Sequence, residues 1–162
     1  MSGNAKFRLF LLAPFAVGLF FTLSLPVQAM EEYTISDEFN GCEHGKLYEL
    51  DGGLILECQE YNYFYEYRPS VIARGREVVQ IGDEKIDGYI HDGSVHSTHI
   101  SDEFEGCDFD KVYPLDNGLI FQCNTYSYTY SYRPKVKIFI INGRRPIIFI
   151  GGKKYSGTLN KG

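Results

Sequence analysis

A tandem repeat restricts the fold of this chain more than any other feature of its sequence. Residues 35–71 recur as residues 100–136, and 22 of these 37 ungapped positions are identical. Beyond that stretch the second copy carries four extra residues, so that Ile81-Gly82 aligns with Ile150-Gly151. Repetition at this period is typical of one structural unit written twice. We therefore expect two copies of a single small unit.

Each copy holds two cysteines with the same separation of 16 residues: Cys42 and Cys58, and Cys107 and Cys123. Four cysteines can pair in three ways. The duplication selects one of them, because an ancestral single unit could pair only its own two cysteines. We predict disulfides Cys42–Cys58 and Cys107–Cys123 in an oxidising compartment, each worth about 3 kcal/mol to a small unit. Buried free thiols are one alternative, and a zinc site is another, although the spacing does not fit structural zinc.

Short apolar or alternating runs separated by turn residues predict antiparallel β structure after residue 30. Hairpins are expected to join residues 46–50 to 54–58, 111–115 to 119–123, and 137–141 to 146–150. The first run of each copy (34–39 and 99–104) is expected to pair with the last (85–90 and 153–159), which would leave no exposed sheet edge. The predicted fold class is all-β, with two tandem units that are each a small SH3-like barrel or a small β-sandwich.

Each copy carries a row of alternating tyrosines: Tyr61, Tyr63, Tyr65 and Tyr67, and Tyr126, Tyr128, Tyr130 and Tyr132. Alternate residues of a strand point to the same face, so each row shares one face. The rings could form the inner wall of a barrel, with their hydroxyls at its rim. They could instead form an exposed binding surface for a sugar or a protein partner. A row about 20 Å long is difficult for a small barrel to cover, so the end rings are expected to be exposed.

The first 29 residues have the three-part pattern of a secretory signal peptide. Lys6 and Arg8 precede an apolar run from Leu9 to Leu25, and residues 27–29 provide a cleavage site. The alternative is an uncleaved membrane anchor, for which this run, interrupted by Pro14, is short. We expect a periplasmic or secreted protein with repeat units at 30–90 and 99–162, joined by a polar connector at 91–98.

The charge of the chain excludes two classes of partner. Its net charge is −5, and loss of Lys6 and Arg8 with the leader would make it −7. Basic side chains supply most of the affinity for nucleic acids and for anionic membranes. We therefore expect no nucleic-acid binding and, after leader cleavage, no stable membrane anchor. The expected partner is an envelope polymer, a glycan or a secreted protein.

No group of residues has the pattern of a catalytic, metal or cofactor site, and we predict none. The densest acidic cluster lacks the ordered spacing of a calcium loop; it consists of Asp102, Glu103, Glu105, Asp108 and Asp110. Three histidines in or next to the connector have no counterpart in the second copy and are interpreted as linker residues: His91, His96 and His99.

The repeated motifs resemble those of a known group of proteins. Asp-Glu-Phe-x-Gly-Cys occurs at 37–42 and 102–107, and a Tyr-x-Tyr-x-Tyr-Arg-Pro run occurs at 63–69 and 128–134. With these motifs the chain resembles small exported proteins of proteobacteria, many of them tandem, over most of residues 34–159. The resemblance implies a bacterial envelope or secreted location. It implies no activity, so no functional residue is carried over.

Three functions follow as hypotheses. The first is a non-enzymatic, exported binding module that uses the tyrosine-rich β surfaces. The second is an inhibitor of a secreted hydrolase, which would insert a loop such as 39–46 or 104–111 into a foreign active site. The third is a hydrolase whose carboxylates meet at the junction of the two copies, which requires two carboxyl groups about 5–10 Å apart.

Overall fold

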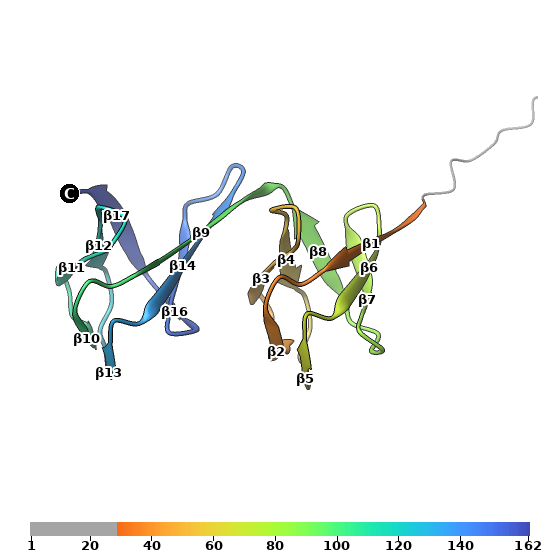
Figure 1. The fold of residues 1–162 in the computed structure, drawn as a ribbon, viewed down its shortest axis with the longest axis horizontal. Coiled ribbons are helices and arrows are strands. Elements are labelled where there is room, and N and C mark those ends of the chain that lie inside the picture. Colours follow the sequence, from red (N-terminus) through yellow and green to blue (C-terminus); the bar gives the residue numbers. More distant parts are fainter. Residues whose placement is uncertain (1–28) are drawn as a thin grey trace, which may run out of the picture.

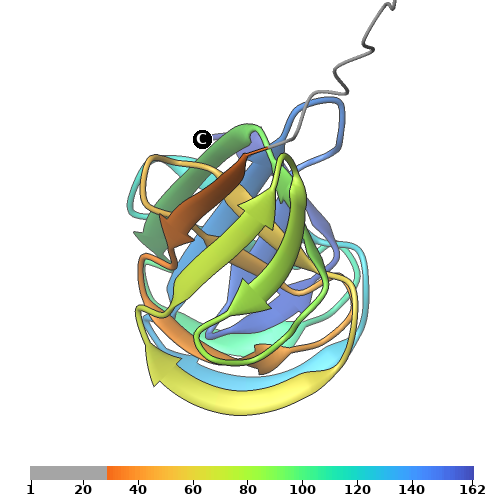
Figure 2. The ribbon, with the colours of Figure 1, turned by 90° about the vertical axis from the view of Figure 1, so that its right-hand side faces the viewer.

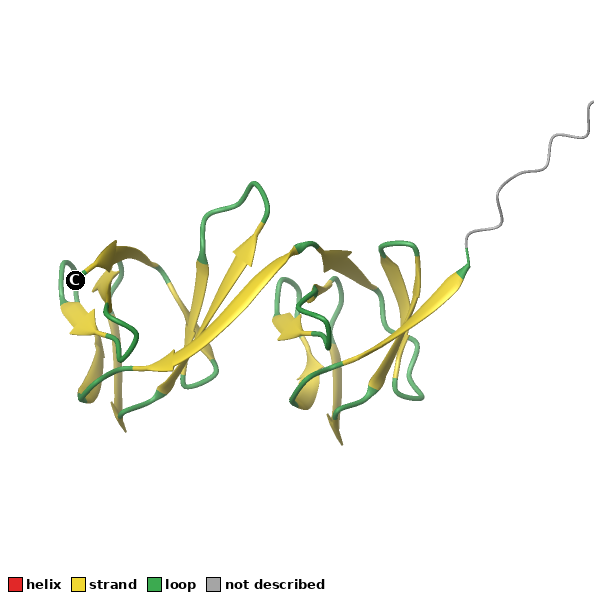
Figure 3. Cartoon of the chain, turned by 45° about the horizontal axis from the view of Figure 1, so that its top comes forward, coloured by secondary structure: helices red, strands yellow, loops and turns green. Residues whose placement is uncertain are grey.

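The computed structural model describes residues 29–162, which fold into two β units arranged along the long axis of the molecule (Figures 1 and 3). Except for Ala29, the predicted leader lies outside the described residues. Every regular element in the described range is a strand, which confirms the all-β class. Within that range, no helix is long and apolar enough to cross a membrane.

The first unit is a small closed barrel. Six of its strands form a sheet in the order β1-β6-β7-β8-β4-β3, and β2 pairs with β5. The sheet closes because Ile35, just after β1, bridges to Leu50, just after β3. The strands are β1 (Met30–Thr34), β2 (Glu38–Cys42), β3 (Leu47–Glu49), β4 (Ile55–Cys58), β5 (Asn62–Tyr67), β6 (Ser70–Arg74), β7 (Glu77–Ile81) and β8 (Gly88–His91).

The second unit repeats this plan but leaves one seam open. Its strands are β9 (Gly93–His99), β10 (Glu103–Cys107), β11 (Val112–Pro114), β12 (Leu119–Cys123), β13 (Ser127–Tyr132), β14 (Lys135–Ile141), β15 (Ile147–Ile150), β16 (Lys153–Tyr155) and β17 (Gly157–Lys161). The Ile100–Leu115 bridge joins the sheets β16-β15-β14-β9 and β11-β12-β17 on one side. On the other side β15 and β17 do not pair, although β7 and β8 of the first barrel do.

A bent ribbon replaces the pairing that we expected between the first and last strands of each copy. β1 and β2 run beside β6 and β5, with Thr34 opposite Ser70 and Glu38 opposite Tyr67. The ribbon bends at Arg68, which has a φ of 52° and precedes Pro69. Consequently β1 pairs with β6 and β9 with β14, while β8 and β17 pair with β4 and β12. The predicted pairing of first with last strand is wrong.

The three predicted hairpins and both predicted disulfides are confirmed. The hairpins are β3–β4, β11–β12 and β14–β15. The disulfides are Cys42–Cys58 and Cys107–Cys123, each with Cα atoms 5.5 Å apart. Each bond connects the end of β2 or β10 to the end of β4 or β12. All four cysteines are oxidised, so the alternatives of free thiols and a zinc site are set aside.

Each barrel has its own apolar core, and the two cores are filled differently. The fully buried Phe39 and Phe104 occupy equivalent positions. Phe64 of β5 packs against Phe39, with ring centroids 4.7 Å apart. Tyr48 and Tyr113 pack on Phe39 and Phe104 at 4.9 and 4.8 Å, and in the second barrel Tyr155 of β16 also packs against Phe104, at 5.2 Å. This exchange explains why β13 can carry the small Thr129 where β5 carries Phe64.

Most of the segment 91–98, expected to be a polar connector, belongs to β9 of the second barrel, while His91 ends β8 of the first. β9 pairs with β14 from Gly93 opposite Ile141 to His99 opposite Lys135. A Cβ atom on Gly93 would lie 2.2 Å from the carbonyl oxygen of Ile140, so the two strands could not approach with a larger residue there. β9 is an edge strand, and all of its residues except Thr98 are half-buried or exposed. Its backbone ladder therefore does not require an apolar sequence.

The two barrels pack together through an apolar cluster. Buried Leu47 and Ile55 of the first barrel contact buried Phe139 and Ile141 of the second, with Val95, Ile147 and Phe149 packed around them. The four extra residues of the second copy fall in the region of the β14–β15 hairpin, whose tip points toward the first barrel (Figure 1). Lengthening of this hairpin thus provides much of the docking surface.

A half-buried ion-pair network closes the same junction. Near the hairpin tip, Arg144 Nη1 donates to Glu57 Oε2 at 2.9 Å, and His91 Nε2 lies 2.6 Å from the same oxygen. Burial alone would raise the pKa of Glu57. The hydrogen bonds and charges of Arg144 and His91 outweigh burial, so this pKa lies below its ordinary value of 4.5.

Acidification is therefore expected to weaken the junction. A carboxylate with a lowered folded-state pKa stabilises the fold above its unfolded pKa, and this contribution is lost as the pH falls through the folded value. We expect the urea midpoint to fall between about pH 6 and about pH 3, and to fall less in Glu57→Gln. Equal losses in the two proteins would show that Glu57 does not carry this pH dependence.

Candidate functional site

Both tyrosine rows are exposed to solvent. Their relative exposures run from 61% at Tyr130 to 86% at Tyr128. Six of these tyrosines lie on β5 and β13, and Tyr61 and Tyr126 directly precede the two strands. Both strands lie on the same side of the molecule, as two views agree (Figures 1 and 2). We call these eight side chains the tyrosine face: Tyr61, Tyr63, Tyr65, Tyr67, Tyr126, Tyr128, Tyr130 and Tyr132.

The interpretation of the rows as the inner wall of a barrel is wrong. Phe39 and Phe104, on the paired strands β2 and β10, already occupy the interior under each ribbon. Apart from the exposed Glu66, the residues that alternate with the tyrosines within β5 and β13 are half-buried instead. Among them Phe64 packs on Phe39, and the Ser127 hydroxyl accepts a hydrogen bond from the Cys107 N–H at 3.2 Å. The rings therefore point outward in both copies.

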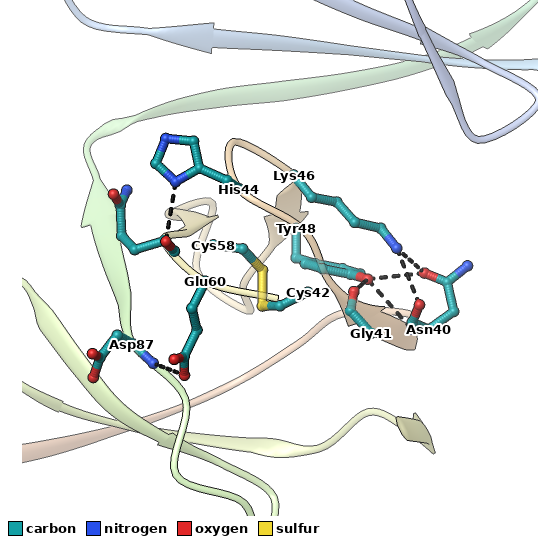
Figure 4. Close-up of a disulfide and its surroundings, with 10 residues drawn as sticks. Asn40, Gly41, Cys42, His44, Lys46, Tyr48, Cys58, Glu60 and Asp87 are labelled. Carbon is teal, nitrogen blue, oxygen red and sulfur yellow. Dashed lines mark hydrogen bonds between the residues drawn. A yellow bond between two sulfur atoms is a disulfide. The ribbon is translucent and has the colours of Figure 1, made fainter. Parts of the chain in front are cut away.

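A close approach at a glycine supports each tyrosine strand. Gly41 and Gly106 have φ values of +85° and +89°, and the ribbon register shifts beside each of them. A Cβ atom on Gly106 would lie 2.1 Å from the Ser127 carbonyl oxygen. The hydroxyls of Tyr48 and Tyr113 donate to the carbonyl oxygens of Gly41 and Gly106, and Figure 4 shows the first beside the Cys42–Cys58 disulfide. These repeated residues hold the ribbon that displays the rings.

Charged groups accompany the rings in both copies. The Tyr130 hydroxyl donates to Glu103 Oε1 at 3.0 Å, and this hydrogen bond raises the pKa of Tyr130. In the first copy, partial desolvation and the neighbouring Glu38 raise the pKa of Tyr65. Lys111 Nζ lies 2.8 Å from Glu105 beside the second row. The face therefore combines aromatic surface with hydrogen-bond donors and acceptors.

The repeated arginines and aspartates have a structural position. Arg68 Nη2 donates to Asp51 Oδ2 at 2.6 Å and Arg68 Nη1 to the Ser36 carbonyl at 3.0 Å. Arg133 donates to Asp116 at 2.8 Å in the second copy. These contacts fasten the corner where each tyrosine strand turns into β6 or β14. They give both copies a structural reason to carry these charges.

The second row borders a hollow of about 320 Å³. Tyrosine rings form part of its wall, and charged side chains form the rest; the main groups are Tyr126, Tyr128, Tyr130, Glu105, Asp108 and Lys111. This volume is at the lower end of the range of small-molecule pockets, which is about 300–1,000 Å³. It could hold one ring of a larger ligand or one side chain of a partner.

Two carboxylates do meet at the repeat junction, beside a hollow of about 210 Å³. Lys137 Nζ lies 3.5 Å from Asp37 Oδ2 and 3.8 Å from Glu49 Oε2, so the two carboxylate oxygens are separated by less than the sum of these distances. The N–H of Glu38, and then the charges of Lys137 and Lys135, keep the pKa of Asp37 below its usual range. Glycoside hydrolysis needs one carboxyl group with a raised pKa. This arrangement favours ion pairing between the barrels over acid catalysis.

The structure places the histidines and the acidic cluster apart from any common centre. His91 contacts Glu57, and His96 lies 3.3 Å from the Ser94 hydroxyl. Within the acidic cluster, Glu105 pairs with Lys111 and Asp110 accepts from Gln122 at 3.1 Å. In residues 29–162, no three His, Cys, Asp or Glu side chains gather closely enough to hold a metal ion.

One exposed aromatic residue escaped the sequence analysis. Phe109 is 68% exposed in the loop 108–111 between β10 and β11, which follows directly on the Cys107–Cys123 disulfide. Its neighbour Asp110 has a φ of 65°, so the loop makes a tight turn there. The sequence did offer one indication of this exposure, because Phe109 stands where the first copy has the polar His44.

Comparison with known proteins identified no relative of this chain. No protein-family model, no curated protein and no solved structure matches the chain significantly. Function is therefore inferred from the tyrosine face and its surroundings.

Proposed function

We propose that this protein is an exported, non-enzymatic binding module whose tyrosine face contacts a repeating polymer of the bacterial envelope. The observation that carries the proposal is the outward display of eight tyrosines at equivalent positions of two repeats, on one side of the molecule. Exposed rings add little to folding, whereas tyrosine is enriched at binding hot spots. The two disulfides and the predicted leader support an oxidising location outside the cytoplasm.

The doubling of the rows favours a polymer over a single small ligand. When one row is bound to a chain of repeating units, the second row meets the next units at a high effective concentration. A ligand with a single unit would gain nothing from the second row. The tyrosine hydroxyls and the carboxylates beside them can exchange hydrogen bonds with sugar hydroxyls. A glycan is therefore our first choice among polymers.

Replacing one central ring in each row is expected to abolish most binding without loss of stability. Tyr63 and Tyr128 are 80% and 86% exposed. Tyr63→Ser/Tyr128→Ser should weaken co-sedimentation with purified peptidoglycan sacculi by about tenfold per ring, because hot-spot rings contribute more than about 1 kcal/mol each. The free energy of unfolding in urea should change by no more than about 0.5 kcal/mol.

Tyr89→Ser is the matched control, because Tyr89 is a partly exposed tyrosine of β8 that lies outside the tyrosine face. It should leave binding unchanged. The proposal fails if the folded double variant binds sacculi as well as the unchanged chain does, or if the unchanged chain does not bind them.

A second candidate, the inhibitor of a secreted hydrolase, is favoured by the exposed Phe109 on its disulfide-tied loop. The same variants separate the two candidates. If the protein is an inhibitor, the immobilised chain should capture a hydrolase from periplasmic extract at a stoichiometric ratio. Capture that survives Tyr63→Ser/Tyr128→Ser but is lost in Phe109→Ala would replace the polymer with an enzyme partner.

A further inference from the structure

The open seam of the second barrel lies beside a strand edge that is occupied in the first barrel. In the first barrel β7 pairs with the outer edge of β8, where the Ile90 N–H donates to the Arg76 carbonyl oxygen at 2.8 Å. In the second barrel, β17 pairs with β12 and with no other strand of residues 29–162. Leu159 stands opposite Phe121 as Ile90 stands opposite Leu56. The N–H groups of Leu159 and, two residues earlier, Gly157 therefore point away from β12 into the seam.

Pro146, directly before β15, opposes extension of the β15–β16 ladder into the seam. β15 pairs with β16 as far as Ile148 opposite Tyr155. Continuation of this ladder would place Pro146 opposite Gly157, and proline has no N–H to donate. The β14–β15 hairpin also contacts the first barrel through Phe139 and Arg144, which holds it away from β17. The two chain segments separate and leave a hollow of about 530 Å³.

The hollow is positively charged and carries no carboxylate. It is lined by the cations Arg145 and Lys154, by backbone of Gly157, and by polar side chains that include Asn124, Thr125 and Thr158. Neither cation has an ion-pair partner in the part of the chain that the structure describes, whereas Arg76 of the first barrel pairs with Asp92 at 2.6 Å. Such a site is unusual in a chain with 21 acidic and 16 basic residues.

We propose that an extended acidic peptide segment of another protein binds in this seam by adding a strand to β17. Its backbone would take, beside β17, the place that β7 takes beside β8. The carbonyl oxygens of the peptide would accept hydrogen bonds from Gly157 and Leu159, and its carboxylates would pair with Arg145 and Lys154. Strand addition supplies affinity through the main chain and selectivity through the side chains. The site is separate from the tyrosine face and does not depend on its function.

The probe is a labelled hexapeptide of alternating valine and glutamate with acetylated and amidated ends, titrated against the full chain by fluorescence anisotropy. Arg145→Glu/Lys154→Glu should weaken binding by about tenfold or more, which corresponds to about 1.4 kcal/mol. Both side chains are exposed, so the variant should fold normally. Amide hydrogen exchange at Gly157 and Leu159 should slow when the peptide is bound.

Two controls separate strand addition from simple charge attraction. Lys85 occupies the position of Lys154 in the first barrel, where the seam is closed, and Lys85→Glu should leave the affinity unchanged. A peptide N-methylated at every residue keeps its charge but has no N–H group to donate to β17 on either edge, and it should bind at least about tenfold more weakly. The proposal is overturned by equal affinity for the methylated peptide, by protection of other amides instead, or by no binding at about 1 mM.

Discussion

Gly106→Ala is expected to destabilise the second barrel by about 4 kcal/mol or more, a loss at the extreme of single substitutions. The left-handed backbone at this position alone costs an L-residue about 1–2 kcal/mol. The new Cβ would also lie 2.1 Å from the Ser127 carbonyl oxygen and 2.9 Å from the Thr129 nitrogen. Both are backbone atoms, so β10 and β13 would have to separate. Urea unfolding followed by tyrosine fluorescence measures the loss in this tryptophan-free chain.

Gly118→Ala is the matched control in the same barrel. Gly118 has a φ of +81°, but a Cβ atom there would meet nothing within 4 Å. It should therefore cost only the backbone term of about 1–2 kcal/mol. If the two variants lose the same stability, the close approach of β10 to β13 is not what makes Gly106 necessary.

Phe139→Ala is expected to cost about 3–5 kcal/mol and to uncouple the two barrels. Phe139 is only 2% exposed, lies in the apolar cluster with Leu47 and Ile55, and packs on Phe149 with ring centroids 5.4 Å apart. Removing its ring leaves a cavity at the junction while both barrel cores stay intact. Urea unfolding should then show two separate transitions, and the amides of β4 should exchange faster than before.

The neighbouring Ile140→Ala tests whether this effect belongs to the junction. Ile140 lies on the same strand but is 37% exposed and is not part of the apolar cluster. Its replacement should cost less than about 1 kcal/mol and leave a single transition. A single transition with an unchanged midpoint in Phe139→Ala would mean that this cluster does not couple the barrels.

The duplication allowed the disulfides to be predicted and the turn residues allowed the hairpins to be predicted, because both depend on positions close in sequence. The orientation of the tyrosine strands could not be predicted in the same way. A two-residue period shows which side chains share a face but not which face is buried. Ser127, Thr129 and Ser131 look like a solvated face, yet they face inward because Phe104 from the paired strand and Tyr155 from β16 fill the barrel. Those contacts are not local in sequence.

The segment 91–98 was interpreted as a polar connector rather than as a strand for a related reason. Its glycine, serine and histidine residues are typical of a linker, but β9 is held by backbone bonds to β14. Only the contact between Gly93 and the Ile140 carbonyl shows why glycine is needed there. The four extra residues of the second copy were visible as an insertion. Their role was not, because it depends on Leu47 and Ile55 in the other repeat.

The charged residues of the candidate site show the same limit. Both copies retain Arg68 and Asp51 or their equivalents, and the sequence alone does not reveal whether such charges bind a ligand or fasten a corner. The structure shows the corner contact. Exposure of the tyrosines and of Phe109 is likewise a property of the folded surface.

The lengthened β14–β15 hairpin makes the two halves complementary rather than interchangeable. The positions of Phe139 and Phe149 are occupied in the first half by Arg74 and Gln80, and that of Leu47 is occupied in the second half by Val112, which is 54% exposed. The second half supplies the aromatic side chains of the interface and the first half supplies the apolar surface that receives them, as in a heterodimer whose two subunits are joined in one chain. A chimera with the halves in reverse order would keep both barrels and lose the joint between them.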